Sequence, residues 1–270
     1  MDFNRLKKSR SKRIYFTIGV ILAGISLVLG LVSLFYTPYD PELMNASLKN
    51  SGCSLTHIFG CDNFGRDIFS RIMVGIMNTM LVSFGTVVIG FVVGLITGAL
   101  TGYFGGVFDE LVMRINDTLF SFPSVLVALV VISCMGTGNK TLIVALGIAF
   151  IPSFTRMVRS EFIRQKQLDY VVSARLMGAS HMRIIFIHIM PNVLPVMVSS
   201  LMIGFNNAVL AEAGLSFLGL GVQPPRSSLG RMLSEAQTYI FSSPGNAFFP
   251  GLAIALMVLG FSLLAEAISD

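Results

Sequence analysis

Charged side chains are scarce in this 270-residue sequence: they make up 12% of the residues, against 54% that are apolar, and the mean hydropathy is +0.78. A soluble domain usually carries about 25% charged residues, and it could not leave so much apolar surface in contact with water. The composition therefore excludes a soluble globular protein. It indicates a protein that resides in a lipid bilayer.

Histidine and cysteine are also rare, with three residues of each type. His57, His181 and His188 are scattered, and no nucleophile, base and orienting acid stand together in the sequence. Cys53 and Cys61 lie near His57 but lack the second cluster that would complete a four-ligand metal site. We therefore expect neither catalytic residues nor a metal site, and no enzyme activity of the chain itself.

Long apolar runs are the main positive feature. The five longest cover residues 14–36, 78–102, 118–135, 191–210 and 250–268, and a shorter sixth run covers 141–154. A helix needs about 17 to 25 residues to cross about 30 Å of hydrocarbon. Because the runs are continuous rather than alternating, a membrane β-barrel is excluded. The sequence predicts an all-α, polytopic bundle of six transmembrane helices.

The distribution of Lys and Arg predicts the orientation. Six basic residues precede the first run, which is too long for a cleaved signal peptide and lacks a small-residue cleavage site. With this end in the cytosol, 13 of the 19 Lys and Arg residues lie on the cytosolic side. Both termini and residues 155–190 are then cytosolic. The net charge of +5 comes from basic residues that set the orientation and contact lipid headgroups. We therefore expect no nucleic-acid partner.

Residues 136–141, Gly-Thr-Gly-Asn-Lys-Thr, superficially resemble a phosphate-binding loop. Asn139 replaces the glycine that should precede the lysine, and the segment lies on the outer side with no strand before it. Any ATP that powers this protein must therefore be bound elsewhere.

The outer connection 37–77 contains Cys53 and Cys61. These two residues form a disulfide or remain unpaired thiols, and the sequence leaves both possibilities open.

The run 191–210 contains polar residues near its outer end, and a polar group in hydrocarbon is costly unless it has a partner or faces water. Asn206, Asn207 and Glu212 either line a translocation pathway or form interhelical hydrogen bonds that serve only packing. In the second run, glycine recurs at nearly every fourth position, which allows a neighbouring helix to approach closely; these residues are Gly85, Gly90, Gly94, Gly98 and Gly102.

Residues 169–191 form a polar, basic helix–Gly–helix segment between two apolar runs. The segment resembles the coupling-loop signature of ABC importer permeases, in which a Glu-Ala-Ala run is followed by a glycine and an Ile-Leu-Pro ending. Ala174, Gly178, Ile189 and Pro191 match the signature. Val172, Ser173 and Met190 replace its Glu, first Ala and Leu.

Two further segments narrow the resemblance. Residues 57–71 resemble a His-x-Leu-Gly-Thr-Asp-x-x-Gly-Arg-Asp-x-x-Ser-Arg block, and residues 211–225 contain Leu-Ser-Phe-Leu-Gly-Leu-Gly. Both blocks are typical of the second permease in the dipeptide, oligopeptide and nickel importer family. The resemblance spans nearly the whole chain.

The resemblance implies a type I ABC importer permease fold with a cytosolic coupling-helix hairpin. It divides the chain into a basic cytosolic N-terminus, a first transmembrane helix, an extracytoplasmic connection and a permease core of five helices, with a coupling loop at about 160–190; the ranges are 1–13, 14–36, 37–77 and 78–270.

The partners implied by the resemblance are a second homologous permease, two cytosolic ATPases and an extracytoplasmic substrate-binding protein, in the plasma (inner) membrane of a bacterium or archaeon. ATP and Mg would be bound by the ATPases, and this chain would bind no cofactor. The hairpin would dock into an ATPase and would itself supply an apolar contact surface, a turn and a polar rim. The residues concerned are Ala174, Arg175, Leu176, Met177, Gly178, Ala179, Ser180 and Arg183.

The expected substrate is a peptide, since peptides are the broadest class that the family carries. A permease for nickel or a metal chelate is the alternative within the family. A stand-alone secondary transporter is the alternative from another class, although the helices contain almost no interior charge for ion coupling.

Overall fold

The computed structural model describes residues 3–268, with side chains from Lys12 onward, so the basic side chains before Lys12 lie outside the described part. Helices dominate the chain. Their bounds are α1 Phe3–Val32, η1 Ala46–Leu48, α2 Ile68–Phe104, α3 Gly106–Phe120, α4 Ser124–Met135, α5 Asn139–Lys166, α6 Asp169–Leu176, α7 His181–Arg183, η2 Ile184–Ile189, α8 Met190–Phe217, α9 Leu229–Ala236, η3 Gln237–Tyr239 and α10 Gly245–Ile268.

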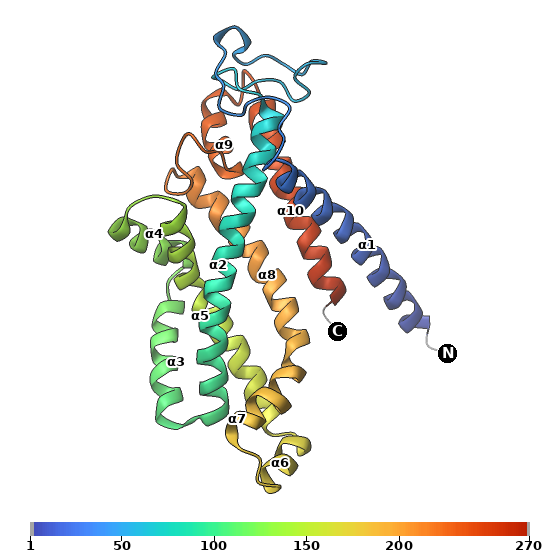
Figure 1. Cartoon of the computed structure of the whole chain (residues 1–270), viewed down its shortest axis with the longest axis vertical. Helices are drawn as coiled ribbons and strands as arrows, with labels where there is room; N and C mark the ends of the chain where they lie inside the picture. The colour runs from blue at the N-terminus through green and yellow to red at the C-terminus, as the bar shows by residue number, and fades with distance from the viewer. Residues whose placement is uncertain (1–2, 269–270) are drawn as a thin grey trace.

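The long helices α2, α5 and α8 run side by side along the longest axis of the molecule, and α1 packs with α10 at their flank (Figure 1). The short helices α6 and α7 lie at one end of this bundle, which we call the hairpin end. The connection between α1 and α2 lies at the opposite end together with α9, and we call this the loop end.

Five helical segments are long and apolar enough to cross a membrane, which confirms the helical membrane class. They are Lys12–Val32, Ile68–Phe104, Asn139–Lys166, His181–Phe217 and Gly245–Ile268. Helices α3 and α4 pass the same test only as a pair. They would provide a sixth span.

The prediction of one continuous helix over residues 118–135 is wrong. The chain bends by 90° between α3 and α4, and Pro123 stands directly before α4. Proline cannot donate a backbone hydrogen bond, and it disfavours helical geometry in the residue before it, here Phe122. The sixth span is therefore a broken pair, and its first half, α3, carries polar residues such as Asp109 and Arg114.

Several predicted boundaries also move. The connection predicted over 37–77 ends at Asp67, because α2 begins at Ile68. The Asp67 carboxylate accepts hydrogen bonds from the backbone N–H and the hydroxyl of Ser70, both at 2.8 Å, and so caps the first turn of α2. The helices around the predicted runs 141–154 and 191–210 are likewise longer, at Asn139–Lys166 and Met190–Phe217.

Helix α2 packs most extensively against α5, through the glycine row of the second apolar run. A β-carbon at Gly98 would lie 2.6 Å from the carbonyl oxygen of Thr155 and 2.8 Å from Cβ of Val158. At Gly102 it would lie 2.7 Å from both the Arg159 oxygen and Phe162 Cβ. These distances are shorter than ordinary van der Waals contacts, so the predicted close approach is confirmed.

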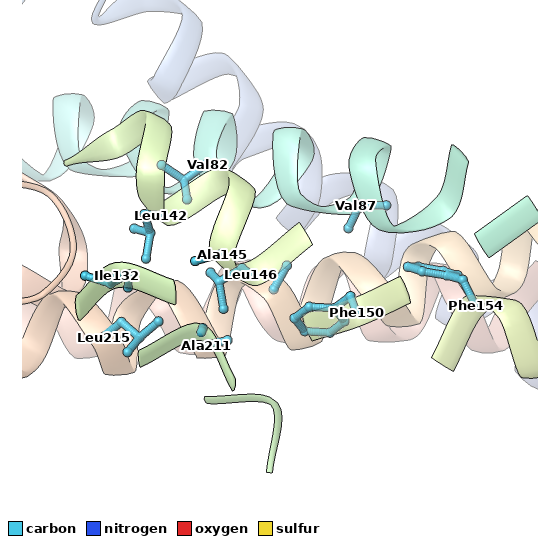
Figure 2. Close-up of a cluster of buried hydrophobic side chains, with 12 residues drawn as sticks. Val82, Val87, Ile132, Leu142, Ala145, Leu146, Phe150, Phe154, Ala211 and Leu215 are labelled. Atoms are coloured by element: carbon cyan, nitrogen blue, oxygen red, sulfur yellow. The ribbon is translucent and has the colours of Figure 1, made fainter. Parts of the chain in front are cut away.

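A cluster of buried apolar side chains fills the space where α2, α4, α5 and α8 meet (Figure 2). Leu142 and Leu146 contribute from α5, and Leu215 contributes from α8. In a membrane, such packing takes the place of the hydrophobic drive that holds soluble cores together. The cluster holds the short helix α4 against the long ones.

The close approach of α2 and α5 predicts the effect of a single added methyl group. We expect Gly98→Ala to destabilise the protein by about 1–3 kcal/mol, because the new β-carbon meets the backbone of α5, which cannot move aside. Thermal or denaturant unfolding in detergent measures this. Gly24→Ala is the matched control, since no atom lies within 4 Å of a β-carbon there. Equal stability of the two variants would contradict the packing.

Candidate coupling and translocation sites

The turn at the hairpin end follows the backbone pattern of a Schellman motif, which is how many helices stop. After α6, the N–H of Gly178 donates to the Arg175 oxygen and the N–H of Ala179 donates to the Ala174 oxygen, both at 3.0 Å. Gly178 has φ +80°, a conformation that glycine adopts without steric cost. Ser180 then caps α7 by accepting from the N–H of Arg183.

One face of the hairpin is anchored and the other is free. Val171 is buried in an apolar cluster with residues of η2, α2 and α5, and Ala174 of the same helix is also buried. At the C-terminal end of α6, Leu176 and Met177 are 84% and 81% exposed. These two large apolar side chains are therefore accessible to a partner.

The structure thus divides the predicted docking residues into two groups. Arg175, Leu176, Met177, Gly178, Ser180 and Arg183 are exposed, in agreement with a docking surface. Ala174 is buried and Ala179 is half-buried, so neither lies fully on the exposed surface of the hairpin.

The three polar residues singled out in and just after the run 191–210 also have different surroundings. Asn207 is exposed, whereas Asn206 is buried and donates from Nδ2 to Ser262 Oγ of α10 at 2.9 Å. Glu212 is completely buried and accepts a hydrogen bond from the hydroxyl of Ser216 at 2.6 Å. Asn206 therefore forms the interhelical hydrogen bond of the packing alternative, whereas the bond of Glu212 stays within α8. Of the three residues, only Asn207 lines a surface pocket.

That pocket lies between α4, α5 and α8 and has a volume of about 380 Å³. Its polar groups are the hydroxyls of Ser124 and Ser153 and the amide of Asn207. A neighbouring pocket of about 180 Å³ shares Phe150, Ser153 and Asn207 and extends the hollow toward Ser200. The combined surface offers neutral hydrogen-bonding groups against an apolar wall.

A cluster of opposite charges lies at the loop end. Asp62 accepts hydrogen bonds from Arg66 Nε at 2.8 Å and from Arg71 Nη1. Glu235 of α9 accepts from Arg66 Nη2 at 2.7 Å and from Arg71 Nη1 at 3.0 Å. Because Asp62 and both arginines are buried, this pairing offsets the cost of removing their charges from water. The cluster joins the connection, the start of α2 and α9.

Sequence reasoning did not assign this cluster. The signal was present, since the block 57–71 concentrates Asp62, Arg66 and Arg71 in a chain with few charges. The partner Glu235 lies 169 residues beyond Arg66, and no local pattern connects the two.

Both cysteines of the outer connection are free thiols in the structure. Cys61 is buried and forms an isolated β-bridge with Asp67, while Cys53 is exposed. The disulfide that the sequence left open is therefore not formed.

Residues 90–270 match the family model of the binding-protein-dependent transport system inner membrane component. The chain belongs to this family. Individual relatives support this membership. The chain is 43% identical over 257 residues to the glutathione transport system permease protein GsiD of Salmonella typhimurium, and the match covers 94% of this chain and 85% of that protein. The proteins of the same name from Shigella flexneri and Escherichia coli are 44% and 41% identical over 245 residues, each covering 90% of this chain and 81% of the relative.

The fold is also that of a solved importer. The structure matches the inward-facing MetNI methionine ABC transporter with a TM-score of 0.58 and 20% sequence identity, over 74% of this chain and 97% of the matched chain. At this identity the match shows the fold alone. It is the type I importer permease fold that the sequence predicts.

The permease is therefore a multi-pass, inner-membrane subunit of a bacterial ABC importer. It is not itself an enzyme, because ATP hydrolysis in such importers takes place on a separate ATPase subunit. Membership of a binding-protein-dependent family implies a substrate-binding protein as a further partner. A stand-alone secondary transporter is no longer a candidate.

The charge cluster predicts an acid-sensitive stability. Burial raises the pKa of the Glu235 carboxyl, but the charges of Arg71 and Arg66 outweigh burial and hold this pKa below its ordinary value of 4.5. A group with a lowered pKa contributes stability that is present above its unfolded pKa and is lost as the pH falls through its folded pKa. The contribution of Glu235 is thus present at neutral pH and is lost below 4.5.

We therefore expect the melting temperature of Glu235→Gln to lie below that of the wild type at neutral pH, and the gap to close as the pH falls below 4.5. Thermal unfolding in detergent from about pH 7 to about pH 3 tests this. Glu42→Gln, at an exposed position of the connection between α1 and α2, should show no such gap. A gap for Glu235→Gln that stays constant with pH would refute the role of the ion pairs.

Proposed function

We propose that the permease forms half of the translocation pathway of an ATP-driven peptide importer, with the hairpin end in the cytosol. The excess of Lys and Arg at the hairpin end and in the N-terminal segment supports this orientation, with both termini cytosolic. The other half of the pathway would come from a second homologous permease. The loop end, with its charge cluster, would then face the extracytoplasmic binding protein.

The exposed tip of the hairpin is the observation that carries the coupling role. Leu176 and Met177 would enter a groove of an ATPase, and Arg175 and Arg183 would form the polar rim around them. Two ATPases would bind the two permeases and hold ATP and Mg. Nucleotide-driven closure of the ATPases would then select one of two packings of the permeases, which requires different contacts in each state.

The turn itself can be tested with a substitution at Gly178. A β-branched side chain at φ +80° is strained, so we expect Gly178→Val to distort the tip, weaken binding of the ATPases and lower transport by more than about tenfold, while the subunit still inserts into the membrane. Co-purification of the ATPases measures the binding, and uptake into proteoliposomes measures the transport.

Gly136→Val is the matched control for this experiment. Gly136 has φ +84° and, like Gly178, has no atom within 4 Å of a β-carbon, but it lies near the start of α5, away from the hairpin. The control variant should retain its ATPases. Normal uptake by Gly178→Val would contradict the docking role of the turn.

The pocket around Asn207 supports a peptide as the substrate. Its hydroxyl and amide groups can exchange hydrogen bonds with peptide N–H and C=O groups, and its apolar wall can contact side chains. The named relatives are glutathione permeases, and glutathione is a tripeptide, so a short peptide such as glutathione is the first candidate. The lining contains none of the His, Cys, Asp or Glu side chains that nickel would favour.

Asn207 and its neighbour Asn206 provide a matched pair for testing the pathway. We expect Asn207→Leu to raise the KM for peptide uptake about fivefold through the loss of a hydrogen bond, with little change in melting temperature. Asn206→Leu should lower the melting temperature and leave the KM of the assembled importer unchanged, because it breaks the contact with Ser262.

The assay is uptake of labelled glutathione and a panel of dipeptides by the reconstituted importer with its binding protein. Equal effects of the two substitutions on KM would argue against the Asn207 pocket. Uptake of a nickel chelate but of no peptide would refute the proposed substrate class.

A further inference from the structure

A hydrogen bond that lies outside the predicted docking surface connects the hairpin to α2. Tyr103 Oη and Nδ1 of His181, the first residue of α7, are 2.8 Å apart, although 78 residues separate them in the sequence. The two rings also contact each other, with centroids 5.6 Å apart, and the ring of Phe104 lies beside them.

Other polar contacts of the hairpin are local. The hydroxyl of Tyr170 donates to Gln165 Oε1 at 2.7 Å, across five residues, and the amide of Asn192 points to the same hydroxyl at 3.4 Å. Neither reaches α2. Among the side-chain hydrogen bonds of the described residues, Tyr103–His181 is the one that links the hairpin to that helix.

The α2 side of this link is held rigidly. Tyr103 is 4% exposed, and its carbonyl oxygen accepts a hydrogen bond at 2.8 Å from Nζ of Lys166, the last residue of α5. Gly102, directly before it, packs against the backbone of Arg159 without space for a β-carbon. A force on His181 therefore acts on α2 and α5 together.

Helix α2 extends from this link to the opposite end of the bundle (Figure 1). There Arg71, in its first turn, pairs with Asp62 and Glu235. Densely packed interiors have low compressibility and transmit strain. A displacement of the hairpin can thus reach the loop end through one element.

We propose that Tyr103 and His181 are positioning residues of energy coupling: their hydrogen bond ties the hairpin to α2, so that movement of a docked ATPase displaces α2 and α5 instead of bending the hairpin. This inference rests on the proposed docking of the hairpin. It adds a specific route by which docking is transmitted.

The test is the number of substrate molecules transported per ATP hydrolysed by the complete reconstituted importer. Tyr103→Phe removes the hydroxyl and keeps the ring contacts, and we expect the ratio to fall on the order of fivefold, the effect of losing one hydrogen bond. His181→Asn, which retains a hydrogen-bonding atom near the place of Nδ1, should keep most of the ratio, whereas His181→Ala should lose it. A purely structural role would reduce the yield of importer and leave the ratio of the surviving complexes unchanged.

Tyr170→Phe is the matched control. The phenol hydroxyl that it removes belongs to the hairpin and forms only local hydrogen bonds. Its ratio should equal that of the wild type. An unchanged ratio in Tyr103→Phe, or an equal loss in Tyr170→Phe, would overturn the proposal.

A cross-link separates failure of this inference from failure of the proposed docking. A cysteine introduced at Leu176 should cross-link to the ATPase in the wild-type and Tyr103→Phe backgrounds alike. No cross-link in either background would refute docking, and the coupling route would fall with it. A cross-link in both backgrounds together with an unchanged transport ratio would refute the Tyr103–His181 route alone.

Discussion

The close contact between α2 and α5 is the constraint on which the rest of the structure depends. At Gly94, Gly98 and Gly102 the two helices leave no room for a β-carbon, so they behave as one unit along much of their length. Without water to drive association inside a bilayer, such close packing is a main source of helix–helix affinity. The hairpin at one end and the charge cluster at the other are both attached to this unit.

The two ends of the bundle are built from different interactions. At the hairpin end a Schellman turn presents Leu176 and Met177 on a short, anchored helix. At the loop end Asp62, Arg71 and Glu235 hold the connection and α9 together through buried ion pairs. The first end is free to bind a partner, whereas the second is closed by contacts within the chain.

Sequence patterns located the helices better than they located their ends and faces. Hydropathy identified the run 118–135 but did not predict the 90° bend before α4, where Pro123 stands. The glycine row was read correctly, because its spacing places every member on one helix face. Asn206 and Asn207 could not be told apart, although one faces α10 and the other a pocket: consecutive helical residues point about 100° apart.

The sequence by itself determined that this is a helical membrane protein, where its polar hairpin lies and which transporter family it resembles. Those conclusions rest on composition, continuous apolar runs and motifs, all of which are local properties of the chain. Only the tertiary structure decided that Ala174 and Glu212 are buried, that Glu235 pairs with Arg66 and that Tyr103 meets His181. Each of these depends on packing between elements far apart in sequence, and no local pattern specifies which residues such packing brings together.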